Sequence, residues 1–207
     1  MQKVFLRSIF LICFFCFVNS GECFVSDGNK KEDKEEISAT LKNELLEVYI
    51  KDNLMIFKGE YLYESILTSD MLAPISFPFY VDETHPFPED IEVSNVTVLT
   101  SKSKILGLTD NSVEYLTVFK KQGTTKLIIR YKQILKEPKA VYLLTTNREK
   151  IPLKALKIYI YISDTYKEVK ISYKYKKTEK REDYILYYIE EKDIIPDKNL
   201  IIEWKEK

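Results

Sequence analysis

The fold of this chain is decided by its stretch LKIYIYI, residues 156–162. Successive side chains of an extended backbone point to opposite faces. The aliphatic side chains of this stretch therefore share one face, and Lys157, Tyr159 and Tyr161 share the other. Such alternation is typical of a strand that packs one face against a core and turns the other toward water. The stretch predicts an amphipathic β-strand.

The same period of two recurs in the rest of the chain. Further strands are expected at residues 55–64, 91–99, 113–119, 126–135, 140–145, 169–176, 184–189 and 200–204. Turn-forming residues such as Gly123, Pro138 and Pro196 separate these runs. We find no apolar run of helical period long enough for the crossovers that a parallel sheet requires. The sequence therefore predicts an all-β fold, an antiparallel, immunoglobulin-like β-sandwich.

The predicted folded domain spans residues 45–207. A break in the strand pattern near residues 137–140 leaves two arrangements open, one large sandwich or two small ones. Residues 21–44 are expected to form a disordered linker, because residues 27–36 are charged or polar and cannot offset the entropy lost on ordering. Residues 37–46 could add one or two turns of helix.

Residues 1–20 have the pattern of a secretory signal peptide. Lys3 and Arg7 precede the apolar run of residues 9–18, and the small residues Ser20 and Gly21 follow it. That run is about half of the roughly 20 residues that a helix needs to cross a bilayer. We expect export to the periplasm or the extracellular space and no transmembrane segment in the mature chain; an uncleaved membrane anchor is the alternative.

The three cysteines all lie near the N-terminus. Cys13 and Cys16 belong to the predicted signal peptide, which leaves Cys23 alone and predicts a mature chain without disulfides. Cys23 is a candidate lipidation site because it follows a hydrophobic region. Glu22 stands where a lipoprotein signal has a small residue, so a free thiol and an intermolecular disulfide remain alternatives.

The charge balance argues against a nucleic-acid partner. The chain has 32 basic and 32 acidic residues, and removal of Lys3 and Arg7 with the signal peptide leaves 30 basic residues and a net charge of −2. Binding to phosphate depends on a concentrated basic face. Another envelope protein or a glycan is the expected partner.

The most unusual segment is the proline-rich stretch of residues 74–90, which contains the single histidine, His85. Asp82, His85 and Glu89 are the candidate metal ligands, because carboxylates and imidazole supply deprotonated ligand atoms. The alternative is a connector between sheets, with its phenylalanines in the core and with His85 and the acids facing water. In that case the prolines prevent regular strand pairing. A recognition loop for a partner is a third interpretation.

Other motifs carry little chemistry. Gly59, Gly107 and Gly123 are too widely spaced for a phosphate-binding loop, and one histidine excludes a multi-histidine zinc site. Trp204 and tyrosines could form a sugar-stacking platform, but the favoured interpretation places the Trp204 indole in the core, at the end of the last strand. Asn95 begins the glycosylation sequon Asn-Val-Thr.

We therefore predict an exported, non-enzymatic binding or structural module with no catalytic residue and no cofactor. The alternatives are a secreted hydrolase or metal-binding protein centred on residues 82–90, and a carbohydrate-binding module. Clustering of Asp82, His85 and Glu89 around an open pocket would favour the hydrolase. A row of exposed aromatic side chains would favour binding of sugars.

Overall fold

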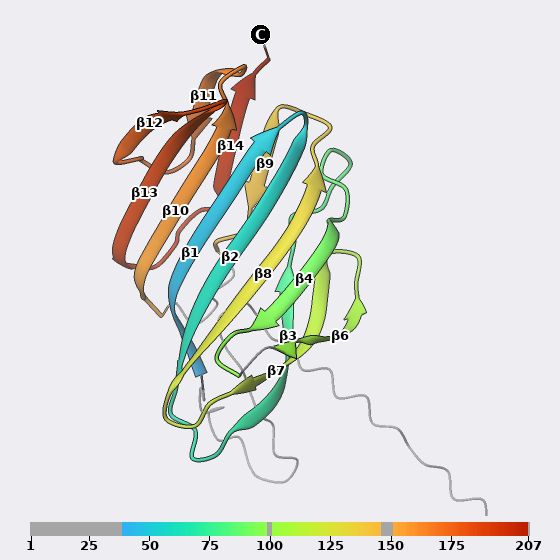
Figure 1. The fold of residues 1–207 in the computed structure, drawn as a ribbon, viewed down its shortest axis with the longest axis vertical. Coiled ribbons are helices and arrows are strands. Elements are labelled where there is room, and N and C mark those ends of the chain that lie inside the picture. Colours follow the sequence, from blue (N-terminus) through green and yellow to red (C-terminus); the bar gives the residue numbers. More distant parts are fainter. Residues whose placement is uncertain (1–38, 99–100, 146–150, 207) are drawn as a thin grey trace, which may run out of the picture.

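The computed structural model describes residues 39–98, 101–145 and 151–206, and these residues form strands and connections without a helix (Figure 1). The predicted signal peptide, Cys23 and most of the predicted linker lie outside the described residues. The all-β prediction is confirmed. Within the described part of the chain, no helix is long and apolar enough to cross a membrane.

The strands form one broad sheet and two small ones. The eight-stranded sheet has the order β12-β13-β10-β1-β2-β8-β4-β5, and the small sheets have the orders β11-β14-β9 and β3-β7-β6. The strand bounds are β1 (Ala39–Lys51), β2 (Leu54–Ser65), β3 (Met71–Pro78), β4 (Glu89–Asn95), β5 (Ser101–Lys102), β6 (Lys104–Leu108), β7 (Ser112–Phe119), β8 (Thr124–Ile134), β9 (Lys139–Tyr142), β10 (Leu153–Ser163), β11 (Lys167–Ile171), β12 (Lys177–Arg181), β13 (Tyr184–Ile194) and β14 (Leu200–Lys205).

Both small sheets lie behind the same face of the eight-stranded sheet (Figure 1). That inner face carries Phe57, which stacks on Tyr142 of β9 at 4.8 Å between ring centroids, and Tyr61, which contacts Phe77 of β3 at 5.7 Å. One hydrophobic core therefore joins all three sheets. This layering is consistent with the predicted β-sandwich, whereas the immunoglobulin-like assignment stays a prediction.

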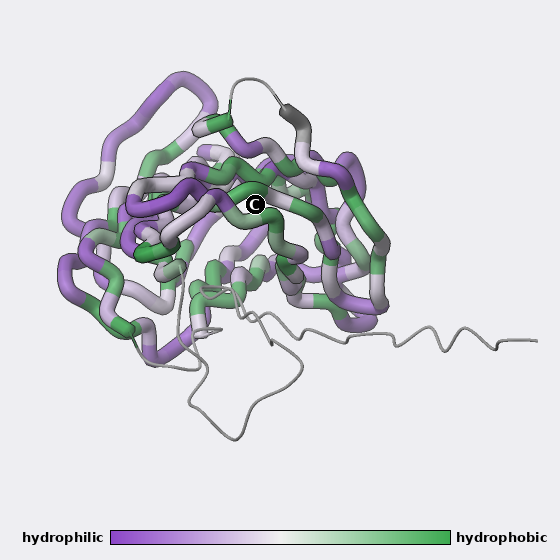
Figure 2. Tube along the Cα trace, turned by 90° about the horizontal axis from the view of Figure 1, so that it is seen from below, coloured by the Kyte–Doolittle hydropathy of each residue, from purple (hydrophilic) through white to green (hydrophobic). Residues whose placement is uncertain are grey.

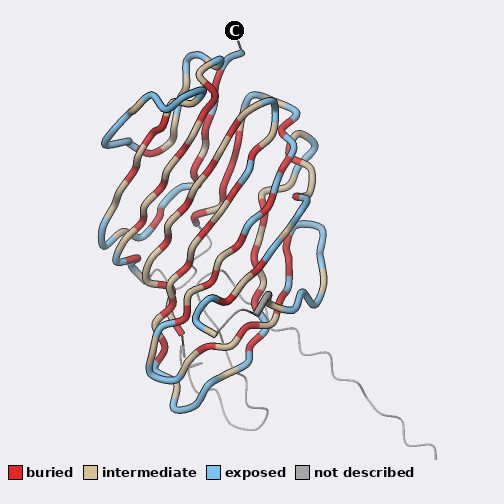
Figure 3. Tube along the Cα trace, in the orientation of Figure 1, coloured by how far each residue is buried: buried red, intermediate tan, exposed pale blue. Residues whose placement is uncertain are grey.

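Burial alternates along the long strands as the sequence pattern predicts (Figure 3). Inner residues of β10 such as Ile158 and Ile160 are completely buried, and outer residues such as Tyr159 and Tyr161 are half-buried. In Figure 2, much of the outline of the molecule is hydrophilic. We call the side of the eight-stranded sheet that faces away from the core its outer face.

One strand pair departs from the antiparallel pattern. β1 pairs in parallel with β10, from Asn43 opposite Ala155 to Ile50 opposite Ile162. β1 is also antiparallel to β2, so the centre of the sheet joins the two halves of the chain. Strands from before and after residues 137–140 consequently belong to one continuous sheet.

The start of β1 corrects the expectations for residues 37–46. From Ala39 onward these residues are strand and not helix, so the folded part begins before residue 45 and the linker predicted over 21–44 is too long at its C-terminal end. The physical reason is a bulge between Leu41 and Asn43, where the pairing with β2 shifts register. The extra residue breaks the period of two, which hides the strand from a pattern search.

β3 corrects the expectation that the prolines prevent regular pairing. Met71–Pro78 pairs with β7 through eight successive residues, including Pro74 and Pro78. β3 is an edge strand of its sheet, so it needs backbone hydrogen bonds on one side only. Proline lacks an N–H donor and is tolerated at such an edge.

Candidate functional site

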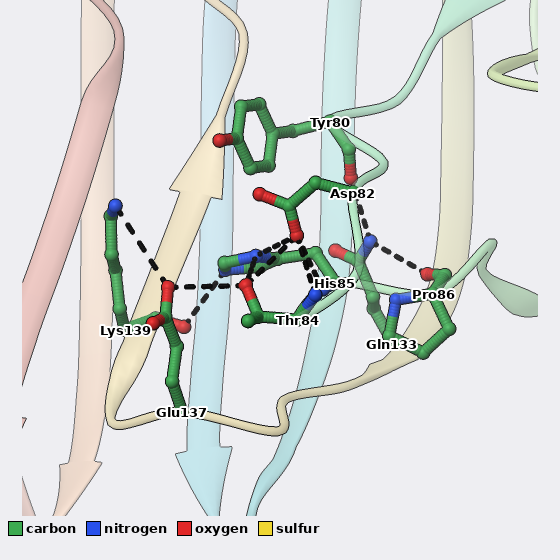
Figure 4. A network of polar contacts seen from close by, with 8 residues as sticks. All are labelled: Tyr80, Asp82, Thr84, His85, Pro86, Gln133, Glu137 and Lys139. Atoms are coloured by element: carbon green, nitrogen blue, oxygen red, sulfur yellow. Dashed lines mark hydrogen bonds and ion pairs between the residues drawn. The ribbon is translucent and has the colours of Figure 1, made fainter.

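The connection between β3 and β4, residues 79–88, is held by a turn around Asp82 (Figure 4). Asp82 Oδ1 accepts hydrogen bonds from the backbone N–H groups of Thr84 at 2.8 Å and His85 at 2.7 Å. It also accepts one from the Thr84 hydroxyl at 2.8 Å and lies 3.0 Å from His85 Nδ1. The turn thus places a carboxylate oxygen directly against the imidazole ring.

His85 is completely buried, with 0% of its surface exposed, so the expectation that it faces water is wrong. The turn directs the ring inward beneath Tyr80, at 5.0 Å between ring centroids. His85 Nε2 lies 3.0 Å from the carbonyl oxygen of Lys139, at the start of β9. Both ring nitrogens are therefore engaged, Nδ1 by Asp82 and Nε2 by the backbone of β9. The imidazole ties the connection to β9.

The electrostatics of Asp82 match this arrangement. Removal of water would raise the pKa of its carboxyl group, but hydrogen bonds from His85 and Thr84 outweigh that effect and hold the pKa well below its ordinary value. Asp82 is therefore ionised over the whole physiological range. The Thr84 hydroxyl also lies 3.1 Å from Glu137 Oε1, so a second carboxylate closes the network.

The three candidate metal ligands do not converge. The structure brings Asp82 and His85 together, whereas Glu89 lies on β4, opposite Lys132 of β8 and exposed to solvent. Within residues 39–98, 101–145 and 151–206, no group of three or more His, Cys, Asp or Glu side chains is placed to hold a metal ion. Phe79 of the same segment packs in the core, as the connector interpretation expects.

Sequence reasoning missed a buried acid, Glu44 of β1. It lies on the inner face, opposite Tyr61 of β2, and its Oε2 atom has no hydrogen-bond partner among the described residues. Burial raises the pKa of Glu44 from its ordinary value of 4.5 to about 8. Glu44 and Leu46 are two residues apart, so the alternation of β1 could have placed Glu44 on the inner face. The register shift at Leu41 obscured this alternation.

The outer face of the eight-stranded sheet carries a hollow of about 640 Å³. It lies over β1, β2, β8 and β4, and its lining includes Glu47, Tyr49, Ile56, Lys58, Arg130 and Lys132. This volume is within the range of small-molecule sites. We call it the outer hollow.

The charges of the outer hollow are arranged in pairs. Lys58 Nζ lies 3.4 Å from Glu47 Oε1 and 2.9 Å from Glu60 Oε1, and Lys132 Nζ lies 2.8 Å from Asp90 Oδ2. Within the described part of the chain, Arg130 has no ion-pair partner. Its exposed guanidinium is therefore the available donor of this surface.

Five half-buried tyrosines continue the outer hollow toward β13. Tyr49 stacks on Tyr161 at 4.3 Å and meets Tyr184 edge to face at 6.1 Å, and Tyr159 packs on Tyr188 at 4.9 Å between ring centroids. We call these five residues the tyrosine strip. Burial, aided by neighbouring groups, raises the pKa of Tyr49 and of Tyr188 to about 12. Their hydroxyl groups therefore stay protonated at neutral pH and can donate hydrogen bonds.

Two other sequence candidates lie in the core. Trp204 is buried and stacks on Tyr166 at 5.4 Å, so its indole closes the core and offers no sugar platform. Asn95 is buried too, and its Nδ2 atom donates to Thr117 Oγ1 and to the Val118 carbonyl, each at 2.9 Å. In this fold the amide nitrogen that a glycan would modify is already engaged.

Comparisons with known proteins give fold relatives only. No family model matches the chain. No curated protein matches it either. Among solved structures, a candidate nutrient-binding protein from Legionella pneumophila superposes with a TM-score of 0.63 at 9% sequence identity, over 81% of this chain and 67% of that one.

Zinc peptidases of the M1 class also resemble the chain. A two-domain M1 zinc metallopeptidase bound to L-arginine gives a TM-score of 0.53 at 8% identity, and the M1 zinc metallopeptidase of Deinococcus radiodurans gives 0.50 at 8% identity. Each match covers 81% of this chain but 43% of the peptidase. At such low identity the likeness shows the fold alone: the chain has the β-sheet architecture of part of these larger proteins.

Proposed function

We propose that this chain is an exported, non-enzymatic binding module whose contact surface is the outer hollow together with the tyrosine strip. The observation that carries the proposal is that the outer hollow and the tyrosine strip adjoin each other on the same face of the sheet. A hollow of about 640 Å³ opens directly beside the stacked pair of Tyr49 and Tyr161. Half-buried tyrosines combine an apolar ring with a polar tip, as binding surfaces commonly do.

Two buried titratable groups, His85 and Glu44, lie away from this surface. His85 has both ring nitrogens engaged in the turn and is shielded from solvent. A general acid or base must reach the atom whose proton it transfers. Glu44 is likewise enclosed between sheets. Neither group can reach a ligand in the outer hollow.

The fold relatives bear on the proposal in two ways. The Legionella protein is described by a binding role, which agrees with a binding module on the same architecture. The peptidase activity of the M1 proteins is not carried over, because His85 is the only histidine of this chain and is buried in a turn. These relatives support the architecture, while the outer hollow supports the function.

A ligand panel tests the proposal. Amino acids, peptides and sugars are screened by thermal shift, and each hit is measured by calorimetry with the wild type, Tyr49→Ala and Tyr175→Ala. Tyr175 is an exposed tyrosine away from the outer hollow, and it supplies the matched control. We expect affinity to fall at least about tenfold, or about 1.4 kcal/mol, in Tyr49→Ala alone.

Mass spectrometry of the recovered ligand completes the test. An unchanged ligand supports binding without turnover. Conversion of the ligand at a rate that depends on this protein would overturn the non-enzymatic proposal. An unchanged affinity in Tyr49→Ala would show that the ligand binds at a different surface.

A further inference from the structure

We infer that the ligand of this surface is a neutral oligosaccharide lying across the strands of the eight-stranded sheet. This inference rests on the proposed binding function and adds the ligand class. Its basis is the strand register, which aligns outer-face side chains in rows across six strands. We call these rows the track.

One row of side chains crosses the sheet at right angles to the strands, with tyrosines at one end and charged residues at the other. Tyr188 of β13 faces Tyr159 of β10, which faces Glu47 of β1. The same row continues through Lys58 of β2 to Arg130 of β8. It ends at Glu92 of β4, which lies opposite Arg130 in the strand register. Neighbouring strands lie about 4.8 Å apart, so the row is roughly 24 Å long, the length of a short oligosaccharide.

A second row runs beside the first on the same face of the sheet. Tyr161 faces Tyr49, Tyr49 faces Ile56, and Ile56 faces Lys132. The two rows are two residues apart along each strand, or about 7 Å, and the outer hollow lies at their charged end. Together the two rows form a band about as wide as a single chain of sugar rings.

The charge balance selects a neutral ligand. The lining of the outer hollow contains three cations, Lys58, Arg130 and Lys132, and three anions, Glu47, Asp90 and Glu92. A polyanion would meet as many like charges as opposite ones. Sugar hydroxyl groups both donate and accept hydrogen bonds, so they complement carboxylates and a guanidinium at once.

The tyrosine end of the track favours a sugar over an extended peptide. Peptides commonly bind a sheet by adding a strand at its edge, where backbone N–H and C=O groups are free. The track lies on the face of the sheet, across β13, β10, β1, β2, β8 and β4, each of which is paired on both sides. Recognition there depends on side chains. Tyr49 and Tyr161 cover one ring face of each other by stacking, so a sugar would meet their remaining apolar ring surface and their hydroxyl groups, which offer hydrogen bonds.

Calorimetry with defined oligosaccharides tests the inference. The probes are malto-, cello-, xylo- and chito-oligosaccharides of increasing length, with oligogalacturonate and short peptides as charged and peptidic comparisons. We expect at least one neutral series to bind, with affinity that rises with length. Raising NaCl from about 0.1 M to about 1 M shortens the Debye length from about 10 Å to about 3 Å and should leave this binding unchanged.

Variants locate the bound sugar. We expect at least about a tenfold loss of affinity in Tyr49→Ala, Tyr159→Ala and Arg130→Ala, and no loss in the control Tyr175→Ala. Tyr49→Phe keeps the stacked ring and should retain most of the binding. Comparison of Tyr49→Phe with Tyr49→Ala therefore distinguishes loss of a contact from misfolding of the sheet. Thermal unfolding of each variant detects misfolding independently.

The outcomes distinguish the ligand class from the surface. Binding of oligogalacturonate or peptide that requires Tyr49, without binding of any neutral series, would overturn the ligand class and keep the surface. Neutral-sugar binding that ignores Tyr49, Tyr159 and Arg130 would keep the class and overturn the surface. Absence of binding by every one of these probes would overturn both.

Discussion

The hydroxyl groups of Tyr61 and Tyr142 lie 2.8 Å apart in a buried hydrogen bond. This bond joins β2 of the eight-stranded sheet to β9 of a small sheet, and Glu44 lies next to it, opposite Tyr61. Burial, with the charge of neighbouring groups, raises the pKa of both tyrosines well above the ordinary value. The polar centre of this apolar interface is thus uncharged as long as Glu44 keeps its proton.

Stability should therefore depend on the protonation of Glu44. In the unfolded chain the carboxyl group loses its proton near its ordinary pKa of 4.5, whereas the folded chain holds it to about 8. Between these values unfolding releases a proton, so the free energy of unfolding falls as pH rises, by at most about 1.4 kcal/mol per pH unit. Below 4.5 both states are protonated, and above 8 both are ionised, so the contribution is constant in each range.

Glu44→Gln should remove this slope. We expect the variant to gain stability relative to the wild type as pH rises from 4.5 to 8, measured by urea unfolding at a series of pH values. Glu83→Gln, an exposed acid in the β3–β4 connection, is the matched control. Parallel curves for the wild type and Glu44→Gln would mean that Glu44 is ionised in the fold.

His85 should matter for stability because its ring joins two segments. His85→Ala leaves Asp82 Oδ1 and the Lys139 carbonyl without their ring partner, and we expect a loss of about 2 to 3 kcal/mol. Glu83→Ala, two residues away and exposed, should stay within about 0.5 kcal/mol. Denaturant unfolding measures both. A change in His85→Ala as small as in the control would show that the turn forms without the ring.

Phe79 provides the scale for that comparison. Its ring lies between Phe87 at 5.4 Å and Tyr131 at 5.1 Å. Phe79→Ala should open a cavity in the core and cost about 3 to 5 kcal/mol. Unfolding under the same conditions checks the value. A cost below that of His85→Ala would contradict the packing described for this segment.

Asn95 should carry no glycan in the folded protein. Its Nδ2 atom makes two buried hydrogen bonds, so a glycan attached there would displace Thr117 and Val118. Mass spectrometry of protein secreted from a eukaryotic host should find Asn95 unmodified in the folded fraction. Asn95→Ala should cost about 1 to 3 kcal/mol because it leaves these groups without a partner. A modified Asn95 in protein with an unchanged melting temperature would argue against this placement.

If the chain is exported, the predicted signal peptide should be removed from it. The proposal rests on Lys3, Arg7 and the apolar run of residues 9–18, and N-terminal sequencing of exported protein should begin near Gly21. Expression of the chain with Arg7 and Lys3 changed to glutamate should impair export, because the charged start orients the signal. Recovery of Met1 in membrane-bound protein would instead identify an anchor.

The long strands could be predicted because their alternation is regular. β10 is an example, since each buried isoleucine alternates with a half-buried lysine or tyrosine. β12 was missed because its five residues, from Lys177 to Arg181, include no apolar side chain. Its position at the edge of the sheet explains that composition, since charged side chains at an edge discourage pairing with other chains. A periodicity search detects strands that bury one face, and β12 buries little.

The candidate site was harder to foresee for a different reason. The local segment around His85 suggested an exposed ring, because acids surround it in the sequence. Its burial depends on Lys139, which is distant in sequence and meets it only in the fold. The outer hollow likewise draws on β1, β2, β8 and β4. Neither set of contacts follows from local pattern, because sheet register determines which side chains are neighbours.

The parallel pairing of β1 with β10 has a consequence for how the chain reaches this fold. Asn43 finds its partner, Ala155, only after most of the chain has been made. Contacts between residues so distant in sequence slow folding, since a long loop must close first. Until then β1 offers an open edge beside the apolar side chains of Leu46 and Val48, which is a template for aggregation. Chains that end before β10 should therefore aggregate, and this protein should be most vulnerable during synthesis until β10, Leu153–Ser163, has been made.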